Sequence, residues 1–335
     1  MVTPMRLHPQ DALSDAHDPM PLWLPPVDHY CGVEKLMRKS LALQADMQGR
    51  FDVTLDCEDG AAVGAEAAHV DLIVDLLRQP QGGRVGVRVH PVDHPAFDME
   101  VHRLVDEAGP RMAYLMLPKI DSAAQLARGA EQIQRAWQRA GHEGVLPLHA
   151  LVETHGALRE VEALAAQPQI ESLSFGLMDF VSAHRGAIPG QAMGVEGQFQ
   201  HPLVLRAKLA ISAACHGHGK VPSHCVVTEL NDPARLQAAA QRAARELGYT
   251  RMWSIHPAQI EPILAAFAPA PGEVDEASDI LCAAQDANWA PTRHRHRLHD
   301  RASYRYYWQL LTQAQHLGLP LPNEARVRFF TKPTA

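Results

Sequence analysis

The chain has 335 residues, of which 46% are hydrophobic and 21% are charged, a composition typical of a folded protein with one large domain or two small ones. The formal net charge of −7 argues against a nucleic-acid-binding protein. No apolar stretch approaches the roughly 20 residues of a membrane span, and residues 1–20 lack the regions of a signal peptide, so we expect a cytoplasmic protein without a membrane partner.

Short apolar runs alternate with stretches of helical spacing between residues 22 and 266. The apolar runs predict strands at residues 22–24, 53–55, 85–89, 113–117, 148–152, 172–176, 221–227 and 252–255. The helical stretches predict helices at residues 33–47, 65–77, 97–108, 122–140, 156–166, 201–216, 233–247 and 258–266. A longer connection at residues 189–200 follows the sixth strand, and residues 1–20, which show no periodicity, are expected to form an extended arm.

Eight strands alternating with eight helices over about 250 residues predict a (β/α)8 TIM barrel. An open doubly wound sheet would need a glycine-rich phosphate loop after its first strand, and the sequence LPPVDHY does not provide one. We therefore predict three parts: an N-terminal arm at residues 1–20, a barrel at residues 21–270, and a C-terminal helical extension or lid at residues 271–335.

The C-terminal extension is predicted to contain helices at residues 271–287 and 300–317, a loop at residues 289–298 between them, and a tail from residue 320. The second helix carries more aromatic side chains than an exposed surface helix needs, namely Tyr304, Tyr306, Tyr307 and Trp308. We expect it to pack on the barrel or on a neighbouring subunit.

In such barrels the chemistry is performed by residues at the carboxyl ends of the strands. Polar residues gather at these predicted ends: Asp56, Glu58, Asp59, Arg88, Lys119, Glu153, Asp179, Ser223, His224, Thr228 and His256. Glu153 directly follows one strand and Asp179 lies in the loop after the next strand, so their carboxylates should converge. They would repel each other unless a hard cation lay between them, and oxygen ligands suit Mg²⁺. The alternative is that each acid caps a helix.

Arg88 occupies a nearly buried strand position, where an unpaired guanidinium would be unstable. The guanidinium must therefore face either Asp56 and Glu58 or a substrate anion. Arg88 has either a functional role or the purely structural role of a salt bridge. Lys119 could form a Schiff base, but the nearby acids favour a metal-dependent reaction with Lys119 in a supporting or purely structural role. His256 is either a packing residue or a ligand contact. No serine or cysteine has the neighbours of a nucleophile.

Six segments form a series in order and spacing: LDCEDG at 55–60, VRVHP at 87–91, LMLPKI at 115–120, LVETHGAL at 151–158, LSFGLMDF at 173–180 and IHPAQI at 255–260. Together they resemble the citrate lyase β-subunit-like branch of the HpcH/HpaI aldolase superfamily, over roughly residues 22–269. The resemblance implies a TIM barrel that uses Mg²⁺ as its cofactor to cleave or form carbon–carbon bonds, by retro-Claisen or retro-aldol chemistry, on thioesters such as malyl-CoA or citramalyl-CoA.

The resemblance also implies roles for individual residues. Glu153 and Asp179 match the metal ligands, and Arg88 matches the arginine that contacts the oxo-acid part of the substrate. Asp56, Glu58 and Asp59 match an acidic cluster that orients the arginine and metal-bound water. The segment RLHDRASYRYYWQLL is similar in position to a C-terminal lid, often delivered to the next subunit, in which Asp300 matches the catalytic acid/base. A homo-oligomer, a trimer or a multiple of one, is implied as well.

The sequence departs from the family pattern at three places. The first loop usually reads close to VPG, whereas this chain has LPPVDHYCGVEKLMRK, with Lys35 and Lys39 as matches for the residues that bind the thioester's phosphates. Ser223-His224 replaces an Ile-Asp pair, and the surroundings of Asp300 are rich in His and Arg. Three other functions therefore stay open: an aldolase acting on free 2-oxo acids, a malyl-CoA thioesterase, and a catalytically silent subunit that depends on an acyl carrier.

Overall fold

The computed structural model describes residues 7–14, 22–61 and 63–331. The chain divides into two compact units, one formed by Pro21–Phe267 and the other by Met1–Met20 together with Ala268–Ala335. No helix among the described residues is both long enough and apolar enough to cross a membrane.

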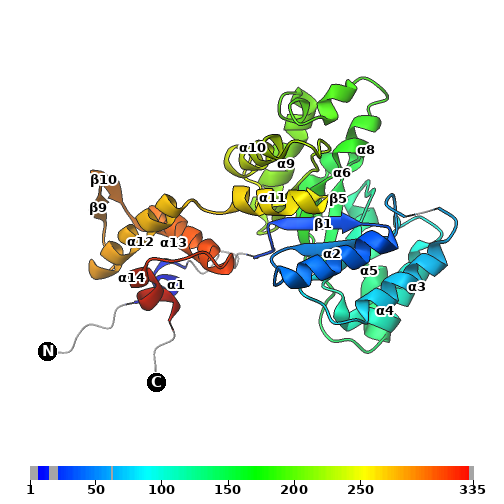
Figure 1. Cartoon of the computed structure of the whole chain (residues 1–335), viewed down its shortest axis with the longest axis horizontal. Coiled ribbons are helices and arrows are strands. Elements are labelled where there is room, and N and C mark those ends of the chain that lie inside the picture. The colour runs from blue at the N-terminus through cyan, green and yellow to red at the C-terminus, as the bar shows by residue number, and fades with distance from the viewer. Residues whose placement is uncertain (1–6, 15–21, 62, 332–335) are drawn as a thin grey trace. The chain divides into compact units, whose positions relative to one another are not determined.

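The larger unit is a closed barrel of eight parallel strands that pair in the order β1 to β8, which confirms the predicted (β/α)8 barrel. The strands are β1 Val27–Cys31, β2 Asp52–Asp56, β3 Val85–Arg88, β4 Tyr114–Leu117, β5 Leu148–Val152, β6 Ile170–Phe175, β7 Val221–His224 and β8 Arg251–Ser254. The helices are α2 Glu34–Asp46, α3 Glu66–Leu77, α4 Phe97–Ala108, α5 Ala123–Arg139, α6 His155–Arg159, α7 Val161–Ala165, α8 Leu177–Ser182, α9 Pro202–Gly217, α10 Pro233–Glu246 and α11 Ile260–Phe267. Figure 1 shows α2 and α11 on either side of β1.

The main apolar core lies between the strands and the surrounding helices, and the inside of the barrel is different. At the amino ends of the strands the interior holds a charged group, in which the fully buried Arg251 lies 2.8 Å from Asp52 and 3.1 Å from Asp28. Thr54 donates a hydrogen bond to Asp28 at 2.6 Å. Burial raises the pKa of Asp52 to about 6, although Arg251 opposes the shift. These buried pairs fill the barrel interior near the amino ends of the strands. In barrels of this kind the ligand binds at the opposite end, at the carboxyl ends of the strands.

The first strand was predicted at residues 22–24, and this is wrong, because β1 lies at Val27–Cys31. The strand carries Asp28 and His29, both buried and both bonded: Asp28 faces Arg251, while His29 bonds to Ser254 at 2.9 Å and to Ser40 at 3.1 Å. A search for apolar runs misses a strand whose polar side chains find partners inside the fold.

Two further predictions for the barrel need correction. The helix predicted at residues 156–166 is divided into α6 and α7, which meet at Glu160. Asp179 was placed in a loop, but it lies in the first turn of α8, where a negative charge is favourable beside the helix N-terminus. The connection at residues 189–200 contains two 3₁₀ turns, Gly190–Met193 and Gly197–Phe199.

The smaller unit has its own apolar core, built from α1 Pro9–Leu13, α12 Pro271–Asp286, α13 Arg301–His316 and α14 Asn323–Ala325. The predicted loop at 289–298 is wrong in part, because β9 Thr292–His294 and β10 Arg297–His299 form an antiparallel hairpin. The predicted tail continues as α14 and a π-helix at Arg326–Phe330. The predicted extended arm is helical at Pro9–Leu13, and its remaining residues, except 7, 8 and 14, lie outside the described residues.

The aromatic residues of α13 pack largely within the smaller unit. Tyr304 is fully buried, and its hydroxyl donates to the carbonyls of Ala290 at 2.9 Å and His299 at 3.0 Å. The Trp308 ring lies 5.3 Å from Phe330 and 6.1 Å from Phe329. This packing explains most of the aromatic content that the sequence had led us to assign to a barrel or subunit contact.

Candidate active site

A cavity of about 390 Å³ opens at the carboxyl ends of the barrel strands. One part of its lining is charged and consists of Asp56, Asp59, Arg88, Glu153 and Asp179. Another part is mainly apolar and aromatic and includes Tyr30, Phe175, Leu177, Met178, Val226, Trp253 and Ile255. The structure thus brings five of the predicted strand-end residues to one cavity.

Glu153 and Asp179 reach the cavity from neighbouring strand ends. Glu153 directly follows β5 and is only 3% exposed, and its Oε1 accepts a hydrogen bond from the Lys119 amide at 2.6 Å. Gly176, which follows β6, leaves room for this carboxylate, because a methyl group on Gly176 would lie 2.1 Å from Glu153 Oε2. Burial, followed by the negative charge of Asp179, raises the pKa of Glu153 to about 8. A cation between the two carboxylates would favour their charged forms and so oppose this rise in the pKa of Glu153.

The donor set fits Mg²⁺ better than a metal that needs many protein ligands. Within residues 7–14, 22–61 and 63–331, no three His, Cys, Asp or Glu side chains are grouped so that they could hold a metal ion together. A zinc site with four protein ligands is therefore excluded in that part of the chain. Mg²⁺ commonly takes one or two protein carboxylates and completes its shell with water and substrate oxygens. Glu153 and Asp179 satisfy that requirement.

Arg88 is clamped by two acids of the β2 end. Asp56 and Arg88 are register partners on β2 and β3, and Asp56 receives hydrogen bonds from Arg88 Nε at 2.7 Å and from Nη2. Glu58 Oε2 lies 3.3 Å from Nη1. Burial alone would lower the pKa of Arg88, but the bonds and charge of Asp56 outweigh it and raise that pKa. The guanidinium is therefore a fixed, permanent cation at the edge of the cavity.

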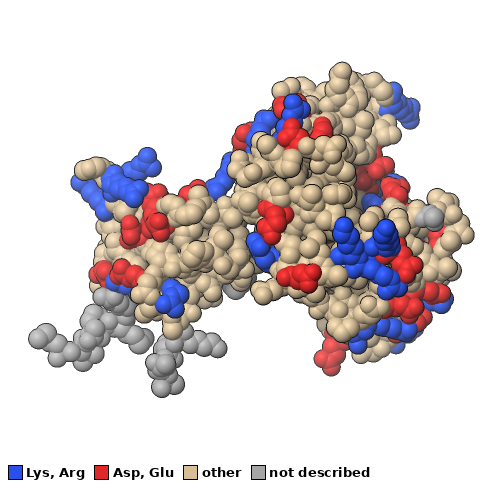
Figure 2. All heavy atoms as spheres, viewed as in Figure 1, with Lys and Arg blue, Asp and Glu red and all other residues tan. Residues whose placement is uncertain are grey.

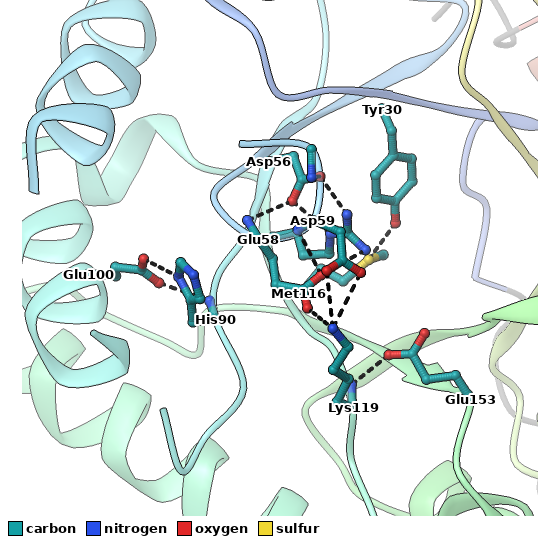
Figure 3. Close-up of polar contacts among 11 residues, drawn as sticks. Tyr30, Asp56, Glu58, Asp59, His90, Glu100, Met116, Lys119 and Glu153 are labelled. Carbon is teal, nitrogen blue, oxygen red and sulfur yellow. Dashed lines mark hydrogen bonds and ion pairs between the residues drawn. The ribbon is translucent and has the colours of Figure 1, made fainter. Parts of the chain in front are cut away.

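Lys119 connects the acidic cluster to Glu153. Its ammonium contacts Glu58 and lies 3.1 Å from Asp59, while its amide holds Glu153 (Figure 3). The residue has a φ of 51°, a strained value for a side chain other than glycine, and these contacts on both sides stabilise it. Burial lowers the pKa of Lys119, but the bond to Glu58 more than offsets this and raises it. A protonated amine cannot form a Schiff base, so the supporting role is favoured.

Lys35 and Lys39 lie exposed on α2, which begins two residues after Gly32 in the cavity wall. Figure 2 shows basic side chains gathered over α2. The neighbouring Arg38 is paired with Glu34 at 2.8 Å. The two lysines therefore place exposed positive charge on the helix that begins next to the cavity wall.

Other predicted residues have structural partners. His256 caps the 3₁₀ turn at Pro257–Gln259, where its Nδ1 accepts from the Ala258 amide at 3.2 Å. His224 is fully buried and stacked on Phe199. Asp300 belongs to the smaller unit and caps α13, accepting from the amides of Ala302 at 3.1 Å and Ser303 at 3.4 Å. The cap explains an aspartate at this position, and its role as acid/base stays a prediction.

Sequence reasoning missed Tyr30 and Trp253, whose rings stack at 4.2 Å in the cavity wall. Tyr30 was expected in a loop because the first strand was predicted too early in the chain, and Trp253 lies inside a predicted strand of which only the end was taken as a site position. The available signal was that the first loop, which contains Tyr30, departs from the family pattern.

Comparisons with known proteins agree with this geometry. Residues 34–257 match the model of the HpcH/HpaI aldolase/citrate lyase family. A citrate lyase structure from Burkholderia xenovorans LB400 is 53% identical, covers 96% of this chain and 100% of that chain, and has a TM-score of 0.87. The L-malyl-CoA/beta-methylmalyl-CoA lyase of Cereibacter sphaeroides is 29% identical over 84% of this chain and 91% of its own length.

The protein CitE of Mycobacterium tuberculosis, solved in complex with magnesium, acetoacetate and coenzyme A, shares the fold. Its TM-score is 0.68 at 22% identity, with 87% of this chain and 98% of that chain covered. The family match spans more than half of the chain, and it confirms the resemblance carried by the six sequence segments. This chain belongs to the HpcH/HpaI aldolase/citrate lyase family, and it is a lyase.

Proposed function

We propose that this protein is a Mg²⁺-dependent carbon–carbon lyase that cleaves a hydroxyacyl-CoA, such as malyl-CoA or citramalyl-CoA, into an oxo acid and an acyl-CoA. The observation that carries the proposal is the shared cavity, in which the clamped Arg88 and the Glu153–Asp179 pair line one space. The substrate named for the Cereibacter sphaeroides relative and the magnesium and coenzyme A bound to the Mycobacterium tuberculosis protein support this substrate class.

Glu153 and Asp179 would hold the ion, which supplies positive charge to the carboxylate and the adjacent oxygen of the hydroxy acid. Arg88 would stabilise the negative charge that develops on a substrate oxygen when the carbon–carbon bond breaks. Because Asp56 fixes the guanidinium by two hydrogen bonds, Arg88 needs little reorientation during the reaction. Glu58, itself held by Lys119, limits movement on the other side of the guanidinium.

The remaining roles follow from charge and position. Lys35 and Lys39 would bind the phosphates of the thioester, since both are exposed on the helix that begins beside the cavity wall. Asp300 would move the proton as acid/base from a homo-oligomeric neighbour. The structural observation that supports this role for Asp300 is its exposed position at the start of α13 in the smaller unit.

The test is a product analysis with Mg²⁺ and either malyl-CoA or citramalyl-CoA. A lyase forms glyoxylate or pyruvate together with acetyl-CoA. Release of free CoA without an oxo acid would instead identify a thioesterase. Carbon–carbon cleavage of a free acid supplied in place of the CoA thioester would identify an aldolase acting on free acids. Turnover only after addition of an acyl-carrier protein would identify the carrier-dependent subunit. Any of these three results would overturn the proposal.

A further inference from the structure

Tyr30 is fixed in the cavity wall next to Arg88. It lies on β1, is 7% exposed and lines the cavity. Its ring stacks on Trp253 with 4.2 Å between centroids and an interplanar angle of 24°. The Arg88 guanidinium carbon lies over the same ring, 5.5 Å from its centroid. The phenol therefore has a defined position, which is the condition for a preorganised hydrogen-bond donor.

The hydroxyl of Tyr30 differs from those of the other buried tyrosines. Figure 3 shows it pointing toward Met116, and it donates to the Met116 sulfur, a weak acceptor. The hydroxyl of Tyr114 bonds to oxygens of Thr54 and Asp28, and those of Tyr249 and Tyr304 donate to backbone carbonyls. Among the buried tyrosines in the described ranges, Tyr30 is thus the one whose hydroxyl has no oxygen partner.

A weak partner makes the hydroxyl available to a ligand. Exchanging a thioether sulfur for a charged oxygen replaces a poor hydrogen bond by a charge-assisted one. Burial, and then the negative charge of Asp28, raise the pKa of Tyr30 well above its usual range. The group therefore keeps its proton near neutral pH and serves as a donor rather than a base.

We propose that Tyr30 is a substrate-contacting residue whose hydroxyl, together with Arg88, binds the thioester oxygen that becomes negatively charged during cleavage. The inference rests on the proposed function. The hydroxyl proton of the hydroxyacyl-CoA leaves to a base, and its O–H electron pair forms the carbonyl of the oxo acid. The electron pair of the breaking carbon–carbon bond then forms the enolate of the acyl-CoA. Protonation of the enolate carbon completes the product, so atoms and electrons balance.

Tyr30→Phe removes the hydroxyl and keeps the stacked ring. We expect kcat for cleavage to fall by about 100-fold, the typical effect of losing one donor to a developing oxyanion, with KM changed less than about twofold. The exchange of acetyl-CoA methyl protons with D2O, followed by NMR in the presence of Mg²⁺, should slow by a similar factor, because it passes through the same enolate.

Two control variants separate this role from a structural one. Tyr249→Phe makes the same chemical change at a buried tyrosine that does not line the cavity, and its kcat should match the wild type. Met116→Leu removes the sulfur acceptor and leaves the Tyr30 hydroxyl, so its kcat should also be preserved. If Met116→Leu or Tyr249→Phe lowers kcat as much as Tyr30→Phe does, the hydroxyl acts through packing and the inference is overturned.

The two proposals fail in different ways. A wild-type enzyme that cleaves no hydroxyacyl-CoA overturns the proposed function and this inference with it. A wild-type enzyme that is active, combined with a Tyr30→Phe variant of unchanged kcat and unchanged proton exchange, overturns the inference alone.

Discussion

At the scale of the residue, Glu153 combines burial with a neighbouring negative charge. Glu153→Gln preserves the shape of the side chain and removes its charge. We expect the variant to lose the rise in melting temperature that Mg²⁺ gives the wild type and to lose at least about 100-fold in turnover, since a metal ligand is removed. Thermal melting with and without Mg²⁺ and the lyase assay check these two results.

Glu261→Gln serves as the control, because Glu261 is exposed and paired with Arg50 at 3.3 Å outside the cavity. This variant should behave as the wild type. Unchanged turnover in Glu153→Gln would refute the metal assignment and leave only the fold and the family membership.

Lys208 on α9 allows a prediction of pH dependence. Its side chain is fully buried, donates to Gln198 Oε1 at 2.8 Å, and lies 4.0 Å from the centre of the Phe199 ring. Burial lowers its pKa from 10.5 to about 8, and Cys225 opposes only part of that shift. Because the pKa of Lys208 is lower in the folded protein than in the unfolded chain, protonation of this side chain lowers the free energy of unfolding. The loss is fully present below pH 8 and disappears as the pH rises from 8 to 10.5.

The unfolding free energy of the wild type, compared with that of Lys208→Met, should therefore rise by about 3 kcal/mol between pH 7 and pH 11. Urea denaturation of both proteins at several pH values measures the difference, and the comparison cancels the titration of groups that do not interact with Lys208. A difference that stays constant with pH would show that Lys208 has an ordinary pKa in the folded protein.

At the scale of the element, the sequence predicted what depends on local periodicity. Helix α4 begins at Phe97 and ends at Ala108 as expected, because the buried side chains of this segment recur at helical spacing. Strand β5 is an apolar run and was found as well. Strand β1 was missed because the partners of its polar residues come from β8, α2 and β2, which no local pattern shows.

The cavity likewise has features that the sequence predicts and features that depend on contacts between distant segments. The meeting of Arg88, Glu153 and Asp179 follows from parallel strands that share one end, so spacing was sufficient to predict it. The contact of Arg88 with Asp56 and Glu58 was one of the two alternatives that the sequence offered for this arginine, and the register of β2 and β3 places Asp56 opposite Arg88. The stack of Tyr30 on Trp253 depends on closure of the barrel between β8 and β1, which cannot be read from a single chain segment.

The junction between β6 and α8 offers a test at the scale of the element. Gly176→Ala would place a methyl group 2.1 Å from Oε2 and 2.5 Å from Cβ of Glu153, so the carboxylate must move. We expect a loss of about 100-fold in turnover, since a displacement of about 1 Å at a reacting site has effects of this size. Gly217→Ala is the matched control, because a methyl group there meets no atom within 4 Å. Equal activity of both variants would show that Glu153 tolerates displacement.

At the scale of the whole molecule, the question is how the smaller unit contributes to catalysis. Its aromatic residues are largely used in its own core, so the expectation of a homo-oligomer rests on the family resemblance rather than on an unpartnered aromatic face. Asp300 caps α13, and asparagine caps helices about as well as aspartate. Asp300→Asn should therefore keep the wild-type melting temperature while lowering turnover, so that any catalytic loss is separated from a loss of the cap.

Mixing two inactive variants tests whether Asp300 serves a neighbouring barrel. Suppose that the subunits form a ring in which each barrel receives the acid of the next subunit. When Asp300→Asn and Glu153→Gln are co-expressed, a complete site then forms wherever the barrel of an Asp300→Asn subunit receives the aspartate of a Glu153→Gln subunit. With equal amounts and random assembly, half of the barrels keep Glu153 and half of their neighbours keep Asp300. Activity should then return to roughly a quarter of the wild-type level. If Asp300 serves its own barrel, no site in the mixed assembly is complete, and the activity should stay at the level of the single variants.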